Sequence, residues 1–87
     1  MPYAIEVSPA AERELRGLPV TVQDKIRPVI RALANEPRPS GVVKMQGRDH
    51  TYRVRSGDYR IVYEIHDAVL QILIVRIANR RDVYRQR

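Results

Sequence analysis

The chain has 87 residues, and we expect one domain (residues 1–87) that can build a single hydrophobic core without staples. It contains no cysteine, which excludes a disulfide framework and thiolate chemistry and fits a reducing cytoplasm. The longest apolar run falls far short of the roughly 20 residues that span a bilayer, and residues 1–6 lack a signal-peptide pattern, so we expect a cytoplasmic protein with no membrane partner.

The net charge of +6 is unevenly distributed along the sequence. Residues 1–40 carry six Lys/Arg against five Asp/Glu, whereas residues 41–87 carry ten against five. Fourteen of the sixteen cations are arginine, whose guanidinium group matches phosphate through a bidentate fork. The second half of the chain is therefore predicted to face a nucleic acid or an acidic protein.

The first half of the chain predicts one strand and two helices. Residues 3–7 alternate in polarity and indicate a strand. A hydroxyl N-cap followed by proline, Ser8-Pro9, starts a helix that ends near residue 17. A second helix is predicted from about residue 19–21 to residue 35, with a kink at Pro28. The predicted buried stripes of the two helices are Ala11, Leu15, Leu18, Val22, Ile26, Val29, Ile30 and Leu33.

The second half of the chain predicts three or four antiparallel strands. Residues 42–45 indicate a short edge strand, and residues 51–65 indicate two strands joined at Gly57-Asp58. After a second tight turn at residues 66–67, the apolar residues 69–77 predict a central strand that is buried on both faces for most of its length. The predicted fold is α+β: an antiparallel sheet with a helical hairpin covering one face and the other face partly open.

The central hairpin is the most informative part of the sequence. A two-residue loop at Gly57-Asp58 places Arg55 opposite Arg60 and Arg53 opposite Val62, so that three arginines share one sheet face. Two arginines directly across a ladder repel each other. This pattern favours a site for an anionic ligand, while a solvated basic face is the alternative interpretation.

Other kinds of site have little support in the sequence. His50 and His66 have no partner at ligand spacing, so neither a metal nor another cofactor is expected. Arginines and a tyrosine can assist the attack of an RNA 2′-hydroxyl on the adjacent phosphodiester without a metal: arginines offset the transition-state charge, and a tyrosine whose pKa is lowered by cations acts as the base. Arg80 and Tyr84, just after the last strand, would complete such a set; the alternative for Tyr84 is packing on the sheet.

Four segments of the chain together resemble the RelE/ParE superfamily of bacterial and archaeal toxins. These segments are Ser8-Pro9-Ala10-Ala11, Asn35-Glu36-Pro37-Arg38-Pro39, Tyr52 to Tyr63, and Asn79-Arg80-Arg81-Asp82-Val83-Tyr84. The resemblance covers essentially the whole chain. It implies that this chain is the toxin of a type II toxin–antitoxin pair. RelE-like members of the superfamily enter the ribosomal A site and cut mRNA there.

The resemblance also implies a set of site residues. The family's catalytic positions match Arg53, Arg55, Arg60, Arg80 and Tyr84, and further cations are expected to contact RNA: Lys44, Arg48, Arg81 and Arg85. Two departures are visible. Arg53 and Arg55 stand where well-known members often have lysine, and Asn79 stands where many relatives have histidine.

Three functions remain open at this point. The first is a ribosome-dependent endoribonuclease, whose partners would be the ribosome with its mRNA and rRNA and a cognate antitoxin. The second is a ParE-like toxin that inhibits DNA gyrase by binding it. The third is a non-catalytic RNA-binding module, which is disfavoured because only Tyr52 and Tyr59 lie near the arginines as stacking groups. An acidic, partly disordered antitoxin segment would suit a chain of net charge +6.

Overall fold

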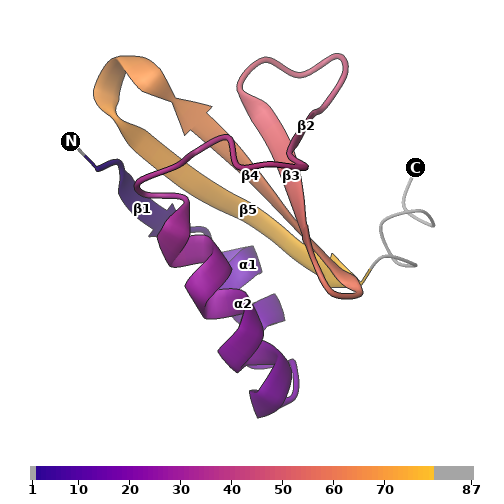
Figure 1. Ribbon diagram of the computed structural model, residues 1–87. Coiled ribbons are helices and arrows are strands. Elements are labelled where there is room, and N and C mark those ends of the chain that lie inside the picture. Colours follow the sequence, from indigo (N-terminus) through magenta and orange to yellow (C-terminus); the bar gives the residue numbers. More distant parts are fainter. Residues whose placement is uncertain (1, 80–87) are drawn as a thin grey trace.

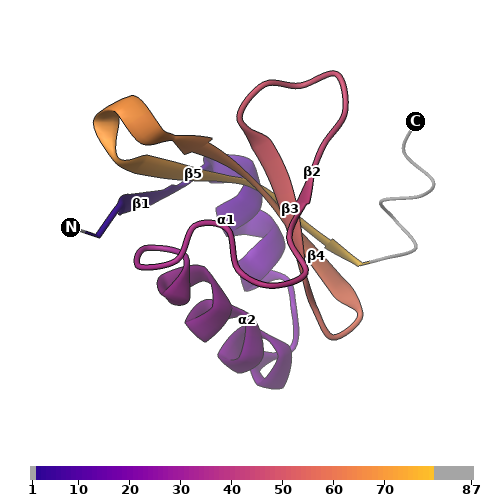
Figure 2. The ribbon, with the colours of Figure 1, turned by 45° about the horizontal axis from the view of Figure 1, so that its top comes forward.

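The computed structural model describes residues 2–79 and contains two helices beside a mixed sheet. The elements in chain order are β1 (Ala4–Val7), α1 (Pro9–Arg16), α2 (Val20–Ala32), β2 (Val43–Lys44), β3 (Thr51–Ser56), β4 (Tyr59–His66), the short 3-10 helix η1 (Asp67–Val69) and β5 (Gln71–Asn79). In the described part, the five strands lie in the order β1-β5-β4-β3-β2. Both helices lie on the same side of this sheet (Figures 1 and 2). The predicted α+β fold is thus confirmed.

One strand differs in direction from the predicted antiparallel sheet. β2, β3, β4 and β5 pair in antiparallel fashion, but β1 pairs with β5 in parallel, from Ala4 opposite Gln71 to Val7 opposite Ile74. Both strands start at the same end of the sheet, where the Ala4 N–H donates to the Leu70 carbonyl at 2.9 Å. The sheet is therefore mixed, with its one parallel pair at the β1 edge.

The helices form where the sequence predicts them. Ser8 caps α1 by accepting from the Ala11 N–H at 3.1 Å, and Pro9 occupies the first turn. Pro28 lies inside α2, which ends at Ala32, before the predicted residue 35. All eight predicted stripe residues belong to the core or pack against it, together with isoleucines and Tyr63 from β4 and β5. The predicted helix–sheet core is confirmed.

The last strand departs from its prediction at its start and in its burial. η1 and Leu70, which has a positive φ of 52°, take up the first residues of the apolar run, so β5 begins at Gln71. Ile72 and Ile74 are fully buried, whereas Leu73 is only half-buried because the helices cover a single face. The expectation of a strand buried on both faces was therefore wrong.

Two local features shape the sheet, one at its edge and one within it. The edge strand β2 has only two residues, shorter than predicted, which limits the exposed hydrogen-bonding edge. A bulge interrupts the pairing of β4 with β5 between Val62 and Tyr63, so that Val62 lies opposite Arg76 while Tyr63 lies opposite Ile74.

In residues 2–79, no helix has the length and apolar character needed to cross a membrane.

Candidate functional site

The β3–β4 hairpin has the register that its sequence predicts. Gly57 adopts a φ of 60° in the two-residue turn, a conformation that glycine reaches without steric cost. Arg55 lies opposite Arg60, and Arg53 lies opposite Val62. Since opposed residues share a sheet face, Arg53, Arg55 and Arg60 project from the side away from the helical core. We call this surface the arginine face.

The three arginines differ in exposure. Arg55 is exposed, Arg53 is half-buried, and Arg60 is buried, with 4% of its surface accessible. A buried guanidinium group must be held by neighbouring groups, which restricts its movement. Arg55 and Arg60 nevertheless form a like-charged cross-strand pair, which costs stability. The arrangement can offer one fixed and two more accessible cations to a phosphate group.

Arg76 of β5 is a fourth cation next to this surface, and sequence reasoning did not assign it to the site. It lies opposite Val62, the neighbour of Arg53 across the hairpin. Its Nε donates to Glu14 Oε2 on α1 at 2.8 Å, and the other oxygen, Oε1, accepts from the Ile77 N–H at 2.8 Å. In the sequence, the only sign of this role was that Arg76 is a charged residue within a largely apolar strand.

The structure brings together only some of the predicted site residues. Lys44 pairs with Tyr52, which faces the core, and so Lys44 lies on the opposite side of the sheet from Arg53. Arg48 is exposed in the loop between β2 and β3. The remaining predicted residues lie outside the described part of the chain: Arg80, Arg81, Tyr84 and Arg85. The catalytic and RNA-binding assignments stay predictions.

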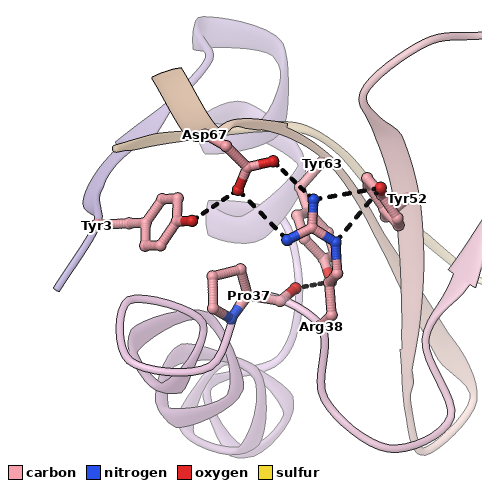
Figure 3. Close-up of polar contacts among 6 residues, drawn as sticks. All are labelled: Tyr3, Pro37, Arg38, Tyr52, Tyr63 and Asp67. Atoms are coloured by element: carbon pink, nitrogen blue, oxygen red, sulfur yellow. Dashed lines mark hydrogen bonds and ion pairs between the residues drawn. The ribbon is translucent and has the colours of Figure 1, made fainter. Parts of the chain in front are cut away.

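A second polar cluster lies on the helical side of the sheet and was missed by sequence reasoning (Figure 3). Arg38, in the loop between α2 and β2, binds Asp67 of η1 through both Nη atoms, at 2.8 and 3.3 Å. The Tyr3 hydroxyl donates to Asp67 Oδ1 at 2.6 Å, and Arg38 Nε and Nη2 each donate to the Tyr52 hydroxyl at 3.4 Å. We call these four residues the Arg38 clamp.

Aromatic contacts extend the clamp into the core. The Arg38 guanidinium carbon lies 5.2 Å from the centre of the Tyr52 ring, and that ring stacks on Tyr63 with centroids 6.2 Å apart. The buried Tyr63 hydroxyl donates to the Pro37 carbonyl at 2.7 Å (Figure 3). Because Asp67 neutralises Arg38, the clamp holds a loop in place and offers no free cation to phosphate. Its sequence signal was the pair of prolines around Arg38, which restricts the loop backbone.

The clamp lowers the pKa of one carboxyl group, and burial raises the pKa of a phenol beside it. Hydrogen bonds from Arg38 and then Tyr3 lower the pKa of the Asp67 carboxyl to about 2. Burial raises the pKa of the Tyr63 phenol to about 12. Asp67 therefore stays charged, and Tyr63 stays neutral, throughout the physiological range.

Asp67→Asn is expected to lower the melting temperature at pH 6 and to lose most of this effect as the pH falls to about 2. The folded-state pKa of about 2 lies below the ordinary value of 3.8, so this carboxylate stabilises the fold above about pH 4 and loses that contribution as the pH falls towards 2. Thermal melts of both proteins between pH 2 and pH 7 would measure the difference. The exposed Asp24→Asn is the control; an Asp67 effect independent of pH would contradict the prediction.

His66 lies at the opposite end of β4 from Arg60, and its ring contacts that of His50. Their rings are 5.3 Å apart, between centroids, and His66 Nε2 contacts Glu64 Oε1 at 2.9 Å. Within residues 2–79, no three potential metal ligands are grouped so that they could hold an ion. Neither ring contacts an arginine of the site in the contacts described above.

Comparisons with known proteins agree on one superfamily of toxins. Residues 5–84 match the model of the family described as the ParE toxin of the type II toxin–antitoxin system parDE. Among curated proteins of Mycobacterium tuberculosis H37Rv, Toxin RelG is 30% identical, covering 99% of this chain and 100% of its own, and Toxin RelE is 32% identical, covering 97% and 88%.

Solved structures share the fold described above. The RelBE2 toxin–antitoxin complex of M. tuberculosis matches with a TM-score of 0.79 and 26% identity, covering 92% of this chain and 100% of the matched chain. The archaeal RelE–RelB complex of Pyrococcus horikoshii OT3 matches with a TM-score of 0.81 and 27% identity, covering 92% and 97%. With the family match over residues 5–84, this chain belongs to the ParE toxin family, within the RelE/ParE superfamily of type II toxin–antitoxin systems.

Proposed function

We propose that this chain is a ribosome-dependent endoribonuclease that cleaves mRNA in the A site and thereby inhibits translation. The observation that carries the proposal is the direct opposition of Arg55 and Arg60, with Arg53 on the same face. Opposed arginines repel each other and do not favour folding by themselves, whereas one phosphodiester can bind the guanidinium groups of both. The identity to Toxin RelE and Toxin RelG of M. tuberculosis supports the same class of toxin.

In the proposed reaction, the RNA 2′-oxygen attacks the adjacent phosphorus and the bond to the 5′-oxygen breaks. This leaves a 2′,3′-cyclic phosphate on one fragment and a 5′-hydroxyl on the other. Arg53, Arg55 and Arg60 bind the phosphate and offset the charge that develops on it. Tyr84 takes the 2′-hydroxyl proton, as predicted from the sequence. One of the arginines, which we assign as Arg80, stabilises the departing 5′-oxygen, and water protonates that oxygen to give the hydroxyl. No metal ion or cofactor is required.

The proposed physiological partner is a cognate antitoxin. Two of the similar solved structures are complexes: the RelBE2 toxin–antitoxin complex and an archaeal RelE–RelB complex. The net charge of +6 favours an acidic, partly disordered antitoxin segment that binds across the toxin surface in the cytoplasm.

A second candidate function is inhibition of DNA gyrase. It is favoured by one observation: the matching family model is described as a ParE toxin. A toxin that acts by binding gyrase has no need of converging phosphate-binding groups. The arginine face therefore separates the two candidates, because it is essential to the first and dispensable in the second.

The deciding experiment is cleavage of mRNA on purified ribosomes with an empty A site, with the cut end mapped by primer extension. The expected result is a cut within the A-site codon by the wild-type chain and by Arg31→Ala, which removes an exposed cation on α2. A supercoiling assay with purified gyrase runs in parallel. Absence of a cut together with loss of supercoiling would overturn the proposal in favour of the gyrase function.

A further inference from the structure

The end of β5 lies beyond the reach of its parallel neighbour. β1 pairs with β5 only as far as Val7 opposite Ile74, whereas β5 continues to Asn79. On the side away from β4, residues 75–79 thus form a sheet edge whose backbone groups need other partners. This stretch also follows the bulge, the place where pairing to β4 changes register.

Helix α1 supplies the partners that β1 no longer provides. The Ser8 N–H donates to the Ile74 carbonyl at 2.9 Å, and Ser8 Oγ donates to the Val75 carbonyl at 3.1 Å. Two turns further along, Glu14 accepts from the Ile77 N–H with one oxygen and from Arg76 Nε with the other, both at 2.8 Å. Hydrogen bonds to a carboxylate are stronger than those between neutral groups. Glu14 thus fixes both the backbone and a side chain of β5.

The segment that Glu14 holds faces the arginine side of the hairpin. Ala78 lies opposite Arg60, and Arg76 lies opposite Val62. Arg60 is buried at this junction, so its guanidinium group can be placed accurately only if the end of β5 stays in register with β4. Glu14 also offsets the positive charge of Arg76 beside a surface that already carries three arginines.

We infer that Glu14 is a positioning residue of the arginine face, acting through Ile77 and Arg76 on the end of β5 and so on Arg60. Glu14 is not one of the proposed catalytic residues, and in this role it contacts no reacting group. Its activity readout depends on the proposed ribonuclease function. Its structural readouts do not.

The chain provides a matched control one half-turn earlier on the same helix. Glu12 forms an ion pair with Arg16 at 3.4 Å, an i,i+4 contact within α1 that does not involve the sheet. Glu14→Gln is the conservative variant, because its amide oxygen can still accept from the Ile77 N–H while the charge opposite Arg76 is lost. Glu14→Ala removes both contacts.

The test measures cleavage on A-site-empty ribosomes and NMR signals of the same full-length variants. Glu14→Ala is expected to lower the cleavage rate at saturating ribosome concentration by about ten-fold to a hundred-fold. The ribosome concentration that gives half of this rate should change less than about two-fold, because a misplaced Arg60 guanidinium group affects the chemical step rather than ribosome binding. The Ile77 amide should exchange faster with solvent, and the Arg60 Nε–H signal should shift. Glu14→Gln should recover Ile77 protection, and Glu12→Ala should match the wild type in each readout.

The outcomes separate this inference from the proposed function. Equal losses in Glu14→Ala and Glu12→Ala, or unchanged Ile77 exchange and Arg60 signal in Glu14→Ala, would overturn the positioning role. If the wild-type chain cuts no mRNA, the ribonuclease proposal fails. The NMR signals then decide the inference: selective changes at Ile77 and Arg60 in Glu14→Ala support it, and their absence overturns it.

Discussion

Arg60→Ala is expected to reduce A-site mRNA cleavage by at least about 100-fold, since removing one preorganised donor to a developing oxyanion costs about 10²–10³ in rate. Arg60 is buried and lies directly opposite Arg55, so its guanidinium group is held in place before substrate arrives. Quantified cleavage on programmed ribosomes under saturating conditions measures the effect. Ribosome binding by the variant should change far less than the cleavage rate.

Burial makes a fold control necessary for this prediction. Arg60→Lys keeps the charge and most of the volume but loses the bidentate fork, so it should stay folded and still cleave poorly. Arg55→Ala removes the exposed member of the same pair and should lose most cleavage with little change in melting temperature. Arg31→Ala on α2 is the charge-matched control. Full cleavage by both Arg55→Ala and Arg60→Ala would refute the proposed site.

Ile72→Ala is expected to lower the free energy of unfolding by about 2–5 kcal/mol, through lost apolar burial and the cavity left behind. Ile72 is fully buried in β5, opposite Ile5 of β1 on one side and Ile65 of β4 on the other. For a domain of this size, each kcal/mol corresponds to about 4–8 °C in melting temperature. Urea unfolding and thermal melts would measure both quantities.

The control for this substitution is Val69→Ala, which shortens an aliphatic side chain that is 67% exposed in η1. Substitutions at such positions stay within about 0.5 kcal/mol. An Ile72→Ala effect as small as that of Val69→Ala would show that β5 does not form the centre of the core.

The hairpin was predictable because its signals are local. The Gly57-Asp58 turn and the alternation on either side determine the register, and with it the face on which Arg53, Arg55 and Arg60 lie. The helices were predictable for the same reason, since Ser8-Pro9 and the apolar spacing act within a few residues. These patterns required no knowledge of the tertiary structure.

The contacts that the sequence did not reveal are non-local. Asp67 binds Arg38 and Tyr3, which are 29 and 64 positions away, and no periodic pattern connects such residues. The parallel direction of β1 and the Glu14 contacts with β5 likewise depend on where distant segments meet. The predicted double-sided burial of the last strand was wrong because composition does not tell how many faces of a sheet the helices cover.

The pairing of β1 with β5 has a consequence for how this chain folds during synthesis. β1 and α1 are made first, yet their partner strand, Gln71–Asn79, is made last among the described strands. Non-local pairing of this kind slows folding, and at about 5–20 residues per second the first segments wait several seconds for their partner. Ala78, the neighbour of Arg60, belongs to that same late strand. A growing chain therefore cannot complete the surroundings of Arg60, which include Ala78, until almost all of the described domain has been made.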